Sequence, residues 1–138
     1  MIDHISIAVS DLQASAAFYE AVLAPLGLMR LVERPATIGF GKRYAEFWLN
    51  ARPGMQPVAD GTGVHICLRA RTKEAVQAFH AAALANGGRC DSAPGMRDAS
   101  TAPYYAAFIL DPDGNKIEAA TFIHASIYRI MYIMENRG

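Results

Sequence analysis

Four side chains that can bind a metal ion occur at matching places in the two halves of the sequence. His4 and His65 each lie at the start of a segment in which apolar and polar residues alternate, and Glu46 and Glu118 lie in the last such segment of their halves. Imidazole and carboxylate groups that converge from several strands are ligands that Zn, Ni, Mn and Fe(II) accept. The pattern predicts one divalent metal site if the fold brings these side chains together.

Each of the four residues also has an ordinary structural explanation. A histidine at the start of a strand is more often a hydrogen-bonded polar residue than a ligand. Glu118 follows a DPDG turn and could be a solvated acid, and Glu46 shares its strand face with Trp48, which could fill the space by aromatic packing. The equivalence of His4 and His65 in the two halves is the observation that favours metal binding.

The two halves are related by an internal repeat. The segment Gly63–Gly88 aligns without a gap on Ile2–Gly27, and the same shift places His65 on His4 and Phe79 on Phe18. Alanine matches in the same alignment are discounted, because the chain is rich in alanine. A repeat of this length predicts two copies of one supersecondary unit.

Each copy is expected to form a strand, a helix and three further strands. The expected strands are 2–9, 28–33, 36–40 and 43–50 in the first copy and 64–70, 89–91, 104–110 and 115–120 in the second. A helix capped by Ser10 or Asp11 and ending at Ala24 follows the first strand, and a helix from Thr72 through Asn86 follows its counterpart. Pro- and Gly-rich Ala51–Gly63 is the expected linker, and Ser92–Pro103 an expected irregular rim loop.

The alternation of apolar residues along these strands predicts an α+β fold. Two paired βαβββ modules would form a curved mixed sheet, with helices on the outer, aliphatic face and a concave cup on the other. The expected organisation is one domain over 1–122, with modules 1–50 and 64–122, the linker 51–63, and a tail 123–138 whose apolar side would suit a subunit contact.

The balance of charged residues limits the kinds of partner that the protein is expected to bind. In 138 residues, thirteen basic and thirteen acidic side chains cancel, so no long-range field favours nucleic acid or an anionic membrane. The expected partner is a small-molecule substrate. Cys67 and Cys90 are too few and too far apart for a disulfide framework, and no leader precedes Ile2, so a cytoplasmic protein with reduced thiols is expected.

Further residues are candidates for contact with the substrate. Trp48, Tyr104 and Tyr105 could stack on planar groups, and Arg69 could meet an anion or a hydroxyl. Cys67 is expected to line the cup as a small residue, not as a nucleophile, because no base lies near it in the sequence.

Three segments of the sequence carry a family resemblance. They are MIDHISIAVSDLQASAAFYEAVLAPLGL at the front, HICL at the start of the second copy and DPDGNKIEAA near the end. Over about residues 1–122 they resemble the vicinal oxygen chelate superfamily, which includes glyoxalase I, bleomycin-resistance proteins, fosfomycin-resistance transferases and extradiol dioxygenases. The resemblance implies metal binding by His4, Glu46, His65 and Glu118, or by three of them without Glu46. It also implies a homodimer, whose cup can combine modules from two chains.

The reaction that the resemblance implies follows from the metal. A divalent ion with open positions chelates two adjacent substrate oxygens and stabilises negative charge there, while Glu46 or Glu118 moves the proton. We therefore expect a glyoxalase-like lyase or isomerase acting on a small oxygenated substrate, with one divalent ion and no nucleotide cofactor.

Other members of the superfamily supply the alternatives. One is a metal-free binding protein of the bleomycin-resistance type, and the others are a ring-cleaving dioxygenase or a thiol transferase. A dioxygenase would need another histidine in the cup, and His80 and His124 are poorly placed for it. A fosfomycin transferase would need a cationic cluster, for which the sequence offers Arg69, Arg97 and Lys116.

Overall fold

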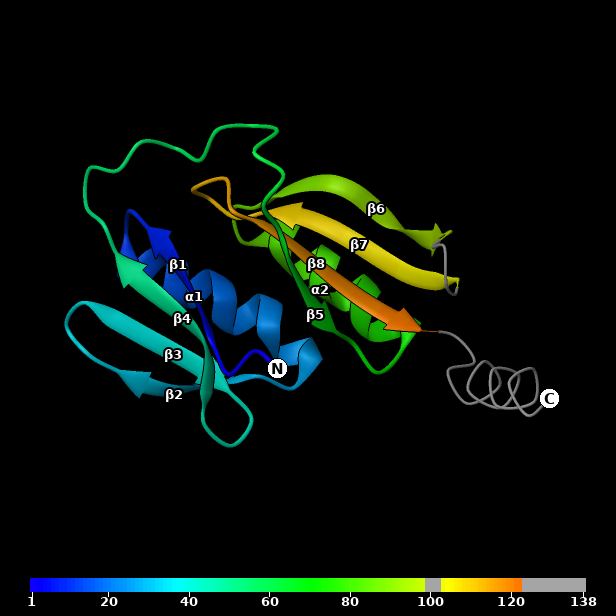
Figure 1. Cartoon of the computed structure of the whole chain (residues 1–138), viewed down its shortest axis with the longest axis horizontal. Coiled ribbons are helices and arrows are strands. Elements are labelled where there is room, and N and C mark those ends of the chain that lie inside the picture. The colour runs from blue at the N-terminus through cyan, green and yellow to red at the C-terminus, as the bar shows by residue number, and fades with distance from the viewer. Residues whose placement is uncertain (99–102, 123–138) are drawn as a thin grey trace.

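The computed structural model describes residues 1–98 and 103–122, which form two units with the same order of elements (Figure 1). Module 1 contains β1 (Ile5–Val9), α1 (Leu12–Leu23), a short 3₁₀ turn η1 (Ala24–Leu26), β2 (Met29–Glu33), β3 (Thr37–Gly41) and β4 (Ala45–Ala51). Module 2 contains β5 (Ile66–Arg69), α2 (Lys73–Ala85), β6 (Arg89–Arg97), β7 (Tyr104–Leu110) and β8 (Lys116–Phe122). The predicted duplication of a βαβββ unit is confirmed.

Each module folds into its own four-stranded mixed sheet. The strand orders are β1-β4-β3-β2 and β5-β8-β7-β6, with the first strand of each module parallel to the last and the other pairs antiparallel. Ile5 pairs with Phe47 in module 1, and Ile66 pairs with Ile117 in module 2. The first strand of each module is therefore a sheet edge, and β1 and β5 lie toward the centre of the molecule (Figure 1).

The helices begin and end where the sequence signals predict. The Asp11 and Thr72 side chains each accept a hydrogen bond from an amide three residues further on, which satisfies one otherwise unpaired donor. After α1 the chain turns at Gly27, whose φ of 80° is a left-handed conformation that favours glycine. Within the described residues, neither helix is long and apolar enough to span a membrane.

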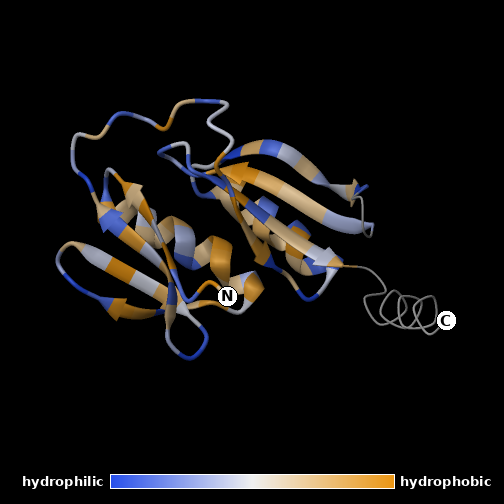
Figure 2. Cartoon of the chain, viewed as in Figure 1, coloured by the Kyte–Doolittle hydropathy of each residue, from blue (hydrophilic) through white to orange (hydrophobic). Residues whose placement is uncertain are grey.

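The core lies between the two helices and the sheets. Apolar and polar residues alternate along the strands (Figure 2), and the apolar face of each sheet packs on the helix of its own module. Phe18, Phe47 and Phe79 are almost fully buried there, and α1 also packs on α2, which joins the two cores into one. The polar faces of both sheets are left free to form the predicted cup.

The first half of one expected loop is a strand. We expected Ser92–Pro103 to be irregular, but β6 continues to Arg97. Two register shifts, between Cys90 and Ser92 and between Ser92 and Gly95, absorb the irregular sequence. An edge strand tolerates Pro94, which has no backbone N–H to donate, because one side of the strand has no neighbour to bond. The remainder of that expected loop at 99–102 and the tail 123–138 fall outside the described residues.

A buried polar cluster ties the modules together at the β7–β8 turn. The Tyr19 hydroxyl donates a 2.6 Å hydrogen bond to Asp111 Oδ2, and the backbone amides of Asp113 and Asn115 donate to Asp111 Oδ1. Asn115 Nδ2 donates to the Ala8 carbonyl at 3.0 Å. Sequence reasoning predicted only a tight turn here; the structure shows that the turn also holds module 2 against α1 and β1.

Candidate active site

A cavity of about 540 Å³ lies between the two modules, at the N-terminal ends of β1 and β5. His4 and Glu46 line it from module 1, and His65 and Cys67 line it from module 2. Three of the four predicted ligands therefore come to one cavity from different parts of the chain.

The fourth predicted ligand is in direct contact with the third. His65 Nε2 lies 3.2 Å from Glu118 Oε1, within ion-pair distance, and so joins the residue preceding β5 to the neighbouring strand β8. The Glu118 side chain is only 5% exposed, whereas that of His65 is 42% exposed. The His65 ring also lies edge-on to Phe108, with ring centroids 5.5 Å apart. Module 2 thus holds an oriented imidazole–carboxylate pair at the cavity wall.

The two predicted ligands from module 1, His4 and Glu46, have fewer contacts that would fix their side chains than His65 and Glu118. His4 Nδ1 lies 2.7 Å from Asp3 Oδ1, and both side chains are more than half exposed. Glu46 is half-buried on β4. Within the described residues, no group of three His, Cys, Asp or Glu side chains is close enough to hold a metal ion. The structure joins His65 to Glu118 and places His4 and Glu46 on the same cavity, but not in coordination contact with that pair.

Cys67 lies beside the buried carboxylate. Its thiol donates a hydrogen bond to Glu118, and partial withdrawal from solvent, followed by the charge of Glu118, raises the pKa of Cys67 to about 12. At neutral pH the group is therefore a thiol, and only a thiolate is strongly nucleophilic. Cys67 lines the cavity as a hydrogen-bond donor to Glu118.

Aromatic side chains occupy the polar sheet faces further from the cavity. Trp48 lies over Gly39, where an added Cβ would be 3.0 Å from the indole ring, and the Arg34 guanidinium lies 5.5 Å from that ring. In module 2, Tyr104 stacks on Phe122 with ring centroids 5.4 Å apart. These are the positions at which planar groups would stack.

Tyr105 does not belong to this surface. Gln77 Nε2 donates to the Tyr105 hydroxyl at 3.0 Å, and Lys73 Nζ lies 5.3 Å from the ring, so Tyr105 faces α2. The prediction that Tyr105 lines the cup with Tyr104 is wrong, because successive residues of a strand point to opposite faces. Arg69, by contrast, is on the polar face of β5, with its guanidinium 5.4 Å from the Phe122 ring.

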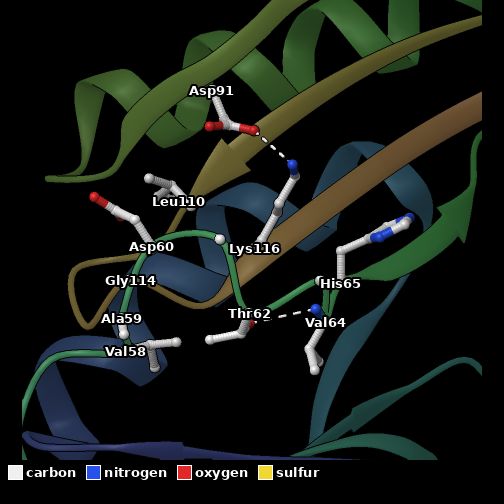
Figure 3. Close-up of a pocket in the computed structure, with 12 residues that line it drawn as sticks. Val58, Ala59, Asp60, Thr62, Val64, His65, Asp91, Leu110, Gly114 and Lys116 are labelled. Atoms are coloured by element: carbon white, nitrogen blue, oxygen red, sulfur yellow. Dashed lines mark hydrogen bonds and ion pairs between the residues drawn. The ribbon is translucent and has the colours of Figure 1, made fainter.

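Sequence reasoning missed a second cavity on the other side of His65. It has a volume of about 300 Å³ and lies between the linker residues Val58–Val64 and β8 (Figure 3). Lys116 Nζ lies 2.9 Å from Asp91 Oδ2 in its wall and 5.0 Å from the Phe108 ring centroid. Lys116 shares a strand face with Glu118, which is the signal that could have placed it near His65.

These features define a class of protein. Two modules of the same βαβββ order each fold into a four-stranded mixed sheet, and each bears a histidine just before its first strand and a glutamate on its last. The family model of the Glyoxalase/Bleomycin resistance protein/Dioxygenase superfamily matches residues 1–119, and the chain belongs to this superfamily. No curated protein matches the chain.

Solved structures agree with this assignment. A glyoxalase/bleomycin resistance protein from Albidiferax ferrireducens T118 is 36% identical, with a TM-score of 0.77 over 86% of this chain and 97% of that one. A family enzyme from Burkholderia phytofirmans PsJN is similar in fold at 22% identity, with a TM-score of 0.67 over 88% and 98% of the two chains. Glyoxalase I from Zea mays is similar in fold at 18% identity, with a TM-score of 0.70. The match includes 99% of this chain and 50% of the Zea mays chain.

Proposed function

We propose that the protein is a glyoxalase-like, divalent-metal-dependent lyase or isomerase acting on a small oxygenated substrate. The observation that carries the proposal is that His4, Glu46 and His65 line one cavity between the modules, while the Glu118 carboxylate lies 3.2 Å from the His65 imidazole. Membership of the superfamily supports it, and the matched structures show that this fold is shared by proteins described as glyoxalases.

The side chains of His4, Glu46, His65 and Glu118 are of the types that bind a divalent metal ion. Two imidazoles and two carboxylates suit Zn, Ni, Mn or Fe(II), and burial and the Cys67 thiol already hold the Glu118 carboxylate beside His65. His4 and Glu46 must approach this pair for all four to bind one ion. When bound, the ion would supply electrostatic stabilisation of negative charge on adjacent substrate oxygens.

The chain's own residues would position the substrate and move the proton. Glu46 faces the cavity from β4, half-buried, and is the carboxylate best placed to take a proton from a substrate carbon. Glu118 is more deeply buried and lies 3.2 Å from His65 Nε2, so it would act as a ligand and orient the imidazole, and it is less accessible to a substrate than Glu46. Trp48 lies further along the same face of β4, where a planar part of the substrate would stack.

The proposal predicts stoichiometric metal that depends on both modules. Protein purified without chelator, or incubated with Zn, Ni, Mn and Fe(II), is expected to contain close to one ion per chain. His4→Ala and His65→Ala are each expected to weaken metal binding at least about a hundredfold, since loss of an outer-shell partner alone costs about 10- to 100-fold. Elemental analysis and competition with a chelator measure this.

His80→Ala is the matched control, because His80 lies on α2 outside the cavity and its replacement should leave metal content unchanged. Protein that takes up none of the four metals would contradict the proposal. Metal that survives both His4→Ala and His65→Ala would mean that the ion binds elsewhere.

A metal-free binding protein of the bleomycin-resistance type is the second candidate. It is favoured by the aromatic rings of Trp48 and Tyr104, which lie half-buried on the polar faces of the two sheets. In that case a planar, cationic ligand would stack on the aromatic rings and meet Glu46. Thermal stabilisation by such a ligand in the presence of chelator, without any response to metals, would select this function.

We also propose that the protein is a cytoplasmic homodimer in which each site lies within one chain. Both cysteines are free thiols, and the edge strand β2 exposes Met29 and Leu31, which would suit a contact with a second copy. Since His4 and His65 of one chain line one cavity, mixing His4→Ala and His65→Ala chains after co-refolding is expected to restore no metal site.

Light scattering of the wild-type protein should give twice the chain mass. Metal content recovered in the mixed refolded dimers would contradict the placement of each site within one chain, because only a site built across two chains can combine the two intact halves.

A further inference from the structure

Three cavities follow one another from the candidate site toward the outer end of α1. The first is the 540 Å³ cavity of the candidate site, and Glu46 and Leu68 line both it and a second cavity of about 220 Å³. Leu26 and Lys42 line both the second cavity and a third of about 270 Å³. The second and third cavities form a groove that begins at Glu46 and ends beside Arg71, which we call the tail groove.

The tail groove is lined by basic side chains. Arg69 and Lys42 line its inner part, and Lys42 and Arg71 line its outer part. Glu46, at the inner end, is its one carboxylate among the described residues. Within those residues no ion pair joins Arg69, Lys42 or Arg71 to an acidic group. The outer part therefore carries two positive charges without a counter-charge from the protein.

Helix dipoles do not explain this pair of cations. The Lys42 side chain lies beside Gly27 at the end of η1, where the carbonyl groups at a helix C-terminus would attract its ammonium group. The Leu23 and Ala24 carbonyls there already accept hydrogen bonds from backbone amides. Arg71 immediately precedes the N-cap of α2, where the helix dipole is positive and a cation is unfavourable. A bound anion would offset the repulsion at this end of the groove.

We propose that the tail groove binds a dianionic group of the substrate, a phosphate monoester or a dicarboxylate, while the reacting oxygens of the same molecule lie beside His65. Lys42 and Arg71 hold the dianion at the outer end. Arg69 lies between it and the reaction site. The proposal rests on the proposed function for the position of the reacting part, and it adds the class of substrate, a molecule with an oxygenated head and an anionic tail.

The experiment titrates chelator-treated protein with inorganic phosphate and, separately, with malonate, at constant ionic strength set by sodium chloride. Calorimetry is expected to show saturable binding of at least one of the two dianions. Lys42→Ala and Arg71→Ala are each expected to weaken it about tenfold, as the loss of a hydrogen bond to a charged group does. Binding of phosphate alone identifies a phosphate ester, and binding of malonate alone identifies a dicarboxylate.

Arg43→Ala is the matched control. Arg43 follows Lys42 in the same turn and carries the same charge, but it does not line the groove, so its replacement should leave the affinity unchanged. Equal weakening by all three substitutions, or no saturable binding of either dianion, overturns the proposal. Since no metal is present in this titration, the metal site and the tail groove can fail independently: dianion binding without metal binding removes the proposed reaction and keeps the groove.

Discussion

Glu118→Gln is expected to abolish metal binding while the protein remains folded. The carboxylate, only 5% exposed, accepts a hydrogen bond from the Cys67 thiol and lies 3.2 Å from His65 Nε2, and an amide of the same shape brings two donors into that position. The variant loses a negatively charged ligand and the partner that orients His65. We expect the metal affinity to fall by more than about a hundredfold, beyond the cost of an outer-shell change alone.

Elemental analysis and chelator competition test this expectation, and circular dichroism with denaturant unfolding monitors the fold. Glu20→Gln is the matched control, because Glu20 is exposed on α1, where it pairs with Arg30 at 2.7 Å far from the cavity. A Glu118→Gln protein that keeps close to one ion per chain would show that Glu118 is not a ligand. An unfolded variant is distinguished by its spectrum and is replaced by Glu118→Asp, which keeps the charge and shortens the reach.

Asp111→Ala is expected to lower the free energy of unfolding by about 2 to 5 kcal/mol, because each buried donor left without an acceptor costs about 1 to 3 kcal/mol. The substitution leaves the buried Tyr19 hydroxyl and the backbone amide of Asp113 without their acceptor. It also removes the anchor between the β7–β8 turn and module 1. Denaturant unfolding measures the loss, and Asp60→Ala, in the exposed linker, should change stability little.

The charge of Asp111 gives this cluster a definite pH dependence. Burial raises the pKa of Asp111 above its ordinary value of 3.8, although hydrogen bonds from Tyr19 and Asn115 act in the opposite direction. A raised folded-state pKa means that the contribution to stability is fully present below 3.8 and is lost as the pH rises through the folded pKa. The unfolding free energy of the wild type, relative to Asp111→Asn, should therefore increase as the pH falls from neutral to about 4. A constant difference would contradict the raised pKa.

Much of the fold could be predicted because its signals are local. The alternation of apolar residues decides which strand face is buried, so Glu46 and Trp48 could be placed on one face and Phe47 on the other before any coordinates existed. Because module 2 repeats the sequence pattern of module 1, the same assignment of buried and polar strand faces could be made there. Tyr105 was misplaced only because its aromatic character was given more weight than the same alternation.

The arrangement of the two modules could not be predicted from such signals. Their relative position depends on contacts between residues far apart in the sequence, such as Tyr19 with Asp111 and Ala8 with Asn115. No periodicity records those contacts. For the same reason the sequence could nominate His4 and His65 as equivalent, but it could not tell that His65 would contact Glu118 while His4 would remain with Asp3.

The buried cluster at the β7–β8 turn has a mechanical consequence. Within the described residues, every hydrogen bond that runs directly from one module to the other involves this turn, at the C-terminal end of β1, whereas His4 lies at the opposite end of that strand. The modules are thus hydrogen-bonded to each other at the Asp111 turn, whereas the two histidines lie at the other end, where the cavity separates the modules. A change in the distance between His4 and His65 would leave the strand pairing of both sheets intact, but it would have to shift the contacts that α2 makes with α1 and η1.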